Sequence, residues 1–277
     1  MKNLQVENIT IKRIASGDIT EAGDLVAVEE PLEIQLSYST ATGRIKKNIA
    51  VTMRTPGNDK ELAAGFLFTE GIIQNKEAIQ EIGHVAADEN RVLVTLHENI
   101  IPVLNKAERN FYSTSSCGIC GKASIDAIRT SSVYKNEPDN ISVKADLLYG
   151  LQDALRKQQE VFENTGGIHA SALFTLNAEF IMLREDVGRH NALDKVIGAA
   201  LTTGILPLNK YILLLSGRAS FELLQKASMA GIKMVVAVGA PSSLAVELAN
   251  ETGITLIGFL RNDRFNIYSG DQRIKTK

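Results

Sequence analysis

The stretch Tyr211-Ile212-Leu213-Leu214-Leu215 is almost wholly apolar, and residues 234–238 (MVVAV) and 254–259 (ITLIGF) repeat the pattern. The segments between them, 220–230 and 242–250, have helical periodicity. Continuous apolar strands joined by helices predict a parallel sheet covered on both faces, with right-handed crossovers. Upstream, the pattern predicts strands at 168–175 and 179–184 and a helix at 188–200. This half of the chain is therefore expected to be a three-layer α/β/α domain.

The first third of the chain is predicted to be rich in strands. Residues 25–39, 47–54 and 91–97 alternate apolar and polar side chains, as half-buried strands do. Between them, Pro56-Gly57 predicts a turn, and Asn58 with Glu61 predicts a capped helix start. Residues 147–162 predict one long helix, whereas 98–122 show no sustained period. We expect a smaller β-rich region over 1–122 that ends in a cysteine loop, followed by the α/β/α domain over 123–277.

Composition narrows the class of protein. The 277 residues carry 30 basic and 32 acidic side chains, and this balance argues against a dedicated nucleic-acid binder. No run approaches the roughly 18 apolar residues that a membrane span needs. Residues 1–14 contain no apolar signal-peptide core, so we expect a cytoplasmic protein.

The chain has two cysteines, which form the motif Cys117-Gly-Ile-Cys120. Such a pair is compatible with half of a zinc site, a dithiol redox centre, a nucleophile with its helper, or chance. A structural zinc site needs four ligands, and the four histidines are widely separated in sequence. A thioredoxin-type pair lies early in a βαβ unit, unlike this one. Lys122 and a helix starting near Ala123 would favour an activated, exposed thiolate.

Polar residues follow each of the three predicted parallel strands. The first strand leads into Ser216-Gly217-Arg218, the second into residues 239–243, and the third into Arg261-Asn262-Asp263-Arg264. Parallel strands place these loops along one carboxyl edge, where open α/β sheets bind ligands. Arginines and helix N-termini favour phosphate. The pattern therefore indicates a site for a nucleotide-like anion, although ordinary turns with solvated arginines would look the same.

A charged cluster opens the helix predicted at 188–200. Arg189 lies beside its apolar stripe, while His190 and Asp194, four residues apart, share a flank. Charges next to a buried face indicate an internal ion-pair network or a site. We expect Asp186, Arg189 and His190 to support a pocket rather than to act as catalysts.

Several motifs are spread along nearly the whole chain: residues 53–57 (MRTPG), 61–67 (ELAAGFL), 69–71 (TEG), 116–121 (SCGICG), 165–171 (TGGIHAS), 185–195 (EDVGRHNALDK) and 216–220 (SGRAS). Together, in this order and spacing, they resemble the FdhD/NarQ formate dehydrogenase accessory proteins.

This resemblance implies a sulfurtransferase with a cysteine persulfide intermediate. Cys117 would accept sulfur from a cysteine desulfurase and pass it to the molybdenum cofactor, a bis-molybdopterin guanine dinucleotide (Mo-bis-MGD), before insertion into formate dehydrogenase; Cys120 would be a relay. The fold would be similar to cytidine deaminases and the protein a homodimer. The family's cofactor-binding stretch falls on Phe259, Leu260, Arg261, Asn262, Asp263 and Arg264. The strand-end pattern adds Ser216 and Arg218 to this binding site for the cofactor or a guanine nucleotide.

Two rival functions follow from the same features. Zinc deaminases need an H-x-E segment followed by a C-x-x-C pair. Here Ser171 stands where that glutamate would be, after His169-Ala170, and the cysteine pair precedes the histidine. Deamination is therefore disfavoured. The other rival is a non-catalytic chaperone that binds the cofactor or the apo-enzyme and uses its cysteines for regulation.

Overall fold

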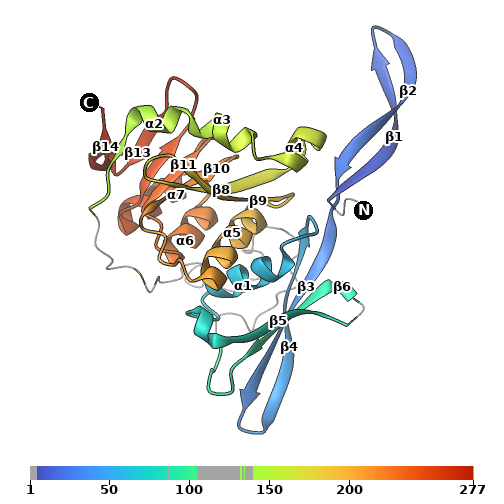
Figure 1. Cartoon of the computed structure of the whole chain (residues 1–277), viewed down its shortest axis with the longest axis vertical. Helices are drawn as coiled ribbons and strands as arrows, with labels where there is room; N and C mark the ends of the chain where they lie inside the picture. The colour runs from blue at the N-terminus through green and yellow to red at the C-terminus, as the bar shows by residue number, and fades with distance from the viewer. Residues whose placement is uncertain (1–4, 87, 105–131, 133, 135–139, 277) are drawn as a thin grey trace.

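The computed structural model describes residues 5–86, 88–104, 132, 134 and 140–276 (Figure 1). It is a mixed α/β structure, as expected, with a six-stranded sheet, a four-stranded sheet and two smaller pairs of strands. Among the residues described, no helix is long and apolar enough to cross a membrane.

The six-stranded sheet has the order β13-β12-β11-β10-β8-β9. Its three central strands are parallel, as predicted from their apolar runs, while the flanking strands are antiparallel to their neighbours. The elements are β8 (His169–Thr175), β9 (Phe180–Asp186), α5 (Arg189–Thr203), β10 (Tyr211–Leu215), α6 (Phe221–Met229), β11 (Met234–Ala237), α7 (Ser243–Thr252), β12 (Thr255–Gly258) and β13 (Asn266–Ser269).

Two apolar clusters cover the two faces of this sheet. The larger includes Leu213 and Val235 with residues of α5, α6 and α7, and the smaller includes Ile212 and Val236 with residues of α2 and α3. Helices therefore lie on both sides, as Figure 1 shows. The larger cluster also contains residues of the N-terminal region, so the two predicted regions share a core. Their expected boundary at residue 122 lies outside the described residues.

The single long helix predicted over 147–162 is wrong. The segment forms α2 (Ala145–Tyr149), α3 (Leu151–Arg156) and α4 (Glu160–Thr165), preceded by β7 (Val143–Lys144), which pairs with β14 (Ile274–Lys275). The chain leaves helical geometry at Gln159, with φ −85° and ψ 80°. A tertiary contact fixes this break, because the Glu185 carboxylate accepts the N–H groups of Val161 and Phe162 at 3.0 Å each. Sequence periodicity carries no signal for such a contact.

The N-terminal region contains the sheet β4-β3-β6-β5, built from β3 (Glu30–Thr40), β4 (Gly43–Arg54), β5 (Ile79–Val85) and β6 (Asp88–Leu96). Helix α1 (Asp59–Thr69) follows β4, and the short 3-10 turns are η1 (Lys76–Ala78) and η3 (Asp271–Arg273). The predicted start of α1 is confirmed, but its capping box is not. Asn58 is left-handed (φ 58°) with no side-chain cap bond, and Glu61 pairs with Arg184 of β9 instead.

A hairpin of β1 (Val6–Ala15) and β2 (Asp18–Ala27) projects away from the body (Figure 1). Both residues of its turn, Ser16 and Gly17, have positive φ angles, of 54° and 92°. This is the pattern of a type I′ turn, whose twist suits a two-residue hairpin. The strand pattern predicted over 25–39 covers only the last three residues of β2 and continues into β3, and the sequence gave no strand prediction for residues 6–24.

Helices α1 and α5 cross at two glycines, which bring their backbones together. A Cβ at Gly65 would collide with the carbonyl of Asp194, and a Cβ at Gly198 would collide with the carbonyl of Glu61. Neither obstacle is a flexible side chain, so neither can move aside without shifting a helix. The crossing fastens the N-terminal region to the α/β region at a distance that only glycine permits.

We predict that Gly198→Ala lowers the free energy of unfolding by at least about 1–3 kcal/mol, the usual cost of overpacking. Gly150→Ala is the matched control, because Gly150 has a right-handed φ of −77° and open space around its Cβ position. The control should be neutral or slightly stabilising. Urea denaturation followed by circular dichroism measures both variants, and equal stability of the two would contradict the crossing.

Candidate functional site

The three loops that follow β10, β11 and β12 lie side by side, as their shared carboxyl edge predicts. The N–H of Gly239 donates to the carbonyl of Gly217 at 3.0 Å, and the N–H of Phe259 donates to the carbonyl of Gly239 at 3.1 Å. Ser242 begins α7 with its side chain accepting from the N–H of Ala245. Backbone hydrogen bonds therefore join the first loop to the second and the second to the third.

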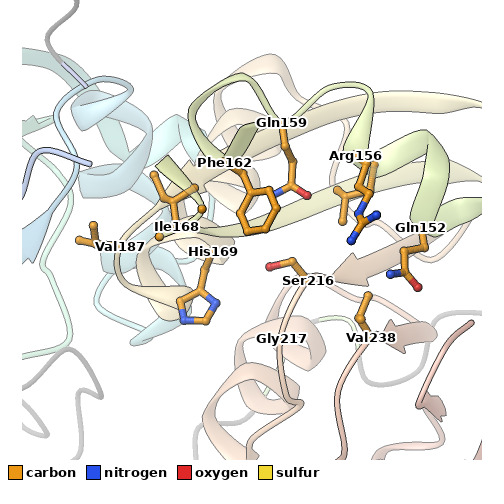
Figure 2. Close-up of a pocket in the computed structure, with 13 residues that line it drawn as sticks. Gln152, Arg156, Gln159, Phe162, Ile168, His169, Val187, Ser216, Gly217 and Val238 are labelled. Atoms are coloured by element: carbon orange, nitrogen blue, oxygen red, sulfur yellow. The ribbon is translucent and has the colours of Figure 1, made fainter. Parts of the chain in front are cut away.

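A cavity of about 470 Å³ opens beside these loops, and we call it the strand-end pocket. Its volume lies in the range of about 300–1,000 Å³ that is usual for small-molecule sites. The lining residues come from α3, α4, the start of β8 and the first two strand-end loops (Figure 2). They are Gln152, Leu155, Arg156, Gln159, Phe162, Gly166, Gly167, Ile168, His169, Val187, Ser216, Gly217 and Val238.

The floor of the strand-end pocket is held by Ser216 and His169. The Ser216 hydroxyl accepts the N–H of Ala170 at 2.8 Å, which ties β10 to β8. His169 lies close to Gly217, where a Cβ would come within 3.3 Å of its Nδ1 atom. Burial lowers the pKa of His169, and the positive charge of Arg189 lowers it further. The imidazole that faces the pocket is therefore neutral near pH 7, and one ring nitrogen is a donor while the other is an acceptor.

Helix α4 and the turn before it form the opposite wall. Phe162 and Gln159 point toward the cavity in Figure 2, and Gln159 is only 4% exposed. Glu185 anchors the start of this helix through the two backbone bonds described above. Burial raises the pKa of Glu185, while the backbone N–H groups of Val161 and Phe162 oppose that rise. An aromatic ring and an amide thus face His169 and Ser216 across the cavity.

None of the predicted residues 259–264 lines this pocket, and the stretch is joined to it only through Arg261. Arg261 donates from Nη1 to the carbonyl of Val238, a lining residue, at 2.8 Å. Its backbone N–H bonds the carbonyl of Arg264 at 2.9 Å, which closes a tight turn. Asn262 donates to Asp153 of α3 at 3.0 Å. Asp263 is exposed to solvent, and so are Arg261 and Arg264.

The first two residues of the 259–264 stretch differ in how far their side chains are buried. Phe259 has a left-handed φ of 54° and is 42% exposed, so its ring is available to a ligand. The Leu260 side chain is fully buried in the smaller apolar cluster. Ser216 lines the pocket, whereas Arg218 lies against Gly239 and is not among the lining residues.

The sequence missed the wall formed by Gln152, Arg156, Gln159 and Phe162. These residues belonged to the segment predicted as one long helix, and the polar side chains of Gln152, Arg156 and Gln159 fitted its solvent face. The glycine pair Gly166-Gly167 is the one signal in the sequence that could have marked a close approach of the backbone to a ligand.

The charged cluster of α5 is an internal ion-pair network, one of the two predicted interpretations. Lys195 and Asp186 are fully buried and lie 2.7 Å apart. The Asp186 carboxylate also accepts the N–H groups of Thr55 and Gly188, and Lys195 donates to the carbonyl of Thr55. Burial raises the pKa of Asp186, and the nearby Lys195 ammonium opposes that rise.

A second buried pair involves Asp194, the residue that precedes Lys195 on α5. Asp194 accepts from Lys226 of α6 at 2.9 Å and from Thr69 of α1 at 2.8 Å. His190 approaches Glu222, with Nε2 3.9 Å from Oε2, and this histidine lowers the pKa of Glu222 to about 2. These contacts join α1, α5 and α6, and none of the residues that make them lines the strand-end pocket.

Cys117, Cys120 and Lys122 lie outside the described residues. Within the described part of the chain, no three histidine, cysteine, aspartate or glutamate side chains are grouped so as to hold a metal ion.

Together, the sheet and pocket define a mixed α/β protein with a cavity beside the carboxyl edge of its parallel strands. The FdhD/NarQ family matches residues 27–275, and the chain belongs to this family. It is 48% identical to the sulfur carrier protein FdhD of Streptomyces avermitilis, over 97% of this chain and 95% of the relative. The sulfur carrier protein FdhD of Sulfolobus acidocaldarius is 40% identical, over 98% and 99% of the two chains.

A solved structure supports the fold. The crystal structure of a candidate formate dehydrogenase accessory protein from Desulfotalea psychrophila superposes with a TM-score of 0.74, covering 98% of this chain and 100% of that one. At 23% identity, this match concerns the fold alone.

We predict that Lys195→Met lowers the free energy of unfolding by about 3–5 kcal/mol, because the buried Asp186 carboxylate loses its partner. The double variant Asp186→Asn/Lys195→Met should regain part of that loss, since no buried charge is left unpaired. Chemical denaturation at pH 7 measures both. A loss below about 1 kcal/mol in the single variant would contradict this account, because that is the range of exposed pairs.

Proposed function

We propose that this chain is a cytoplasmic, homodimeric sulfurtransferase that serves formate dehydrogenase. Cys117 accepts persulfide sulfur from a cysteine desulfurase, and the sulfur passes to Mo-bis-MGD before that cofactor enters formate dehydrogenase. The observation that carries the proposal is family membership over nearly the full length, with relatives named sulfur carrier proteins. The deaminase-like character of the α/β region belongs to the same proposal.

The chemistry of loading needs one reactive thiolate. The Cys117 thiolate attacks the outer sulfur of the desulfurase persulfide, the sulfur–sulfur bond breaks, and the desulfurase cysteine leaves as a thiolate. Cys117 then carries one additional sulfur. The basic Lys122 nearby in sequence favours the thiolate form at neutral pH.

Unloading has two routes that differ in the role of Cys120. In the first, the Cys120 thiolate attacks the outer sulfur and carries it onward as a relay. In the second, Cys120 attacks the inner sulfur of the Cys117 persulfide, which forms a Cys117–Cys120 disulfide and releases hydrosulfide. The two thiols supply both electrons in the second route, so the sulfur leaves fully reduced.

The strand-end pocket is the proposed place for a guanine nucleotide portion of the cofactor. Phe162 in the pocket lining and the exposed Phe259 outside it offer rings for stacking on a base, and Gln152, Gln159 and Ser216 offer polar groups for its edge or the ribose. Arg261 and Arg264 supply positive charge for the phosphates. The cofactor is the substrate that receives sulfur here, and the pocket only holds it.

We predict that incubation with a cysteine desulfurase and cysteine adds the mass of one sulfur atom to the peptide that contains Cys117. Mass spectrometry of Cys117→Ala and Cys120→Ala assigns the residue: the adduct should vanish in the first variant and persist in the second. If Cys117→Ala supported full formate dehydrogenase activity in cells, sulfur transfer would be excluded and the non-catalytic chaperone would be the better account.

We predict that guanosine diphosphate binds the protein and that Arg261→Ala and Arg264→Ala each weaken binding about tenfold, the loss of roughly one charge-assisted hydrogen bond. Arg91→Ala on β6 is the control, since this exposed arginine belongs to the N-terminal sheet. Isothermal titration calorimetry measures the three affinities. Unchanged binding in both strand-end variants would place the nucleotide site elsewhere.

A further inference from the structure

The β1–β2 hairpin is a long ladder without a third strand. Its register runs from Val6 opposite Ala27 to Ala15 opposite Asp18, and no other described strand pairs with either edge. An isolated two-stranded hairpin is marginally stable in water, and an exposed strand edge invites pairing with another chain. Ile14 and Ile19, directly opposite each other near the tip, are 71% and 67% exposed. The hairpin is therefore built like half of a larger sheet.

One backbone hydrogen bond shows which groups the free edge presents. The N–H of Val28 donates to the carbonyl of Gln5, which extends the same register by one pair. Hydrogen-bonded pairs alternate along an antiparallel ladder, so the odd-numbered residues of β1 bond to β2. The even-numbered residues direct their N–H and carbonyl groups outward. These are Val6, Asn8, Thr10, Lys12 and Ile14.

The sequence of β1 is complementary to itself when it is paired antiparallel about Thr10. That register places Glu7 opposite Arg13 of the partner subunit, which pairs opposite charges, and Ile9 opposite Ile11 of the partner subunit. Each directly opposed pair lies on one face of the sheet. Thr10 at the centre is one of the residues whose backbone groups point outward, so the hydrogen-bond phase and the side-chain pattern select the same register.

The other edge of the hairpin lacks this property. β2 carries Asp18, Glu21 and Asp24 and no basic residue, so a pair of β2 strands would bring like charges together. Helix α4 also packs at the base of the hairpin, mainly against β2. The β1 edge is therefore the one suited to a second copy.

We propose that β1 pairs with β1 of a second copy of this chain, which joins two hairpins into a four-stranded antiparallel sheet with a two-fold axis at Thr10. Such an interface is closed, because each copy presents the same surface to the other. It buries Ile9 and Ile11 against each other, and it brings Val6 opposite Ile14 of the partner subunit. A foreign strand would need the same alternation of charge to fit equally well.

This interface rests on the homodimer of the proposed function, and the hairpin gives its location. A monomeric wild-type chain would overturn the homodimer and the interface together, whereas a dimeric Thr10→Pro variant would overturn the interface alone. Neither result bears on persulfide formation on Cys117, which is measured separately.

Thr10→Pro tests whether the free edge of β1 forms the interface between two copies. Proline removes the outward N–H of Thr10 and leaves every β1–β2 hydrogen bond intact, and it is tolerated on an edge strand whose N–H faces solvent. The wild-type chain of 30.1 kDa should have twice that mass by sedimentation at micromolar concentration, and Thr10→Pro should have the single-chain mass. Gly23→Pro is the matched control, since Gly23 lies opposite Thr10 on the β2 edge. It should remain a dimer.

Exchanging the charges of Glu7 and Arg13 tests the register of the β1–β1 pairing. Glu7→Arg and Arg13→Glu should each weaken the dimer at least tenfold, because each single change sets like charges opposite one another. The double variant Glu7→Arg/Arg13→Glu should restore it. Circular dichroism confirms that each variant is folded. A monomeric wild-type chain, a dimeric Thr10→Pro variant, or a double variant as weak as the single ones would overturn the proposal.

Discussion

The close crossing of α1 and α5 is the constraint on which the rest of this structure depends. At Gly65 and Gly198 the two helices meet backbone to backbone, so each lies closer to the other than side chains would allow. Because of that closeness, Asp194 of α5 reaches Thr69 of α1, and Lys195 reaches the carbonyl of Thr55 before α1. Buried charges of α5 thus find their partners in the N-terminal region. Helix α5 packs against the six-stranded sheet on one side and against α1 on the other, and the two regions form one hydrophobic core.

The buried ion pairs make this arrangement specific more than they make it stable. A carboxylate and an ammonium taken out of water recover little net energy from each other, whereas either one left alone costs several kcal/mol. Asp186 with Lys195 and Asp194 with Lys226 therefore penalise any packing of α5 that separates them. Apolar side chains alone would tolerate a helix rotated or shifted by a residue. These pairs fix where the loop at Gly188 lies, and with it the Val187 edge of the strand-end pocket.

The sequence was most informative where one physical effect dominates. The apolar runs of β10, β11 and β12 admit little besides buried parallel strands, so both the strands and the neighbouring positions of their loops could be predicted. Prediction failed where a distant partner decides the local structure. Glu185 anchors the start of α4 just after the break at Gln159, and this contact positions the part of the pocket wall that bears Phe162. Asn58 likewise loses its capping partner because Arg184 binds Glu61. Long-range pairs of this kind leave no periodic trace along the chain.

The backbone hydrogen bonds that link the three strand-end loops have a consequence for ligand exchange. Gly217, Gly239 and Phe259 are connected main chain to main chain, so the loops cannot rearrange one at a time. A molecule that settles there meets a floor that is already ordered, and little conformational entropy is lost on its arrival. The bound molecule can also leave without any refolding of the loops. Under the proposed function, exchange of a client at these loops would therefore be limited by side-chain contacts rather than by motion of the backbone.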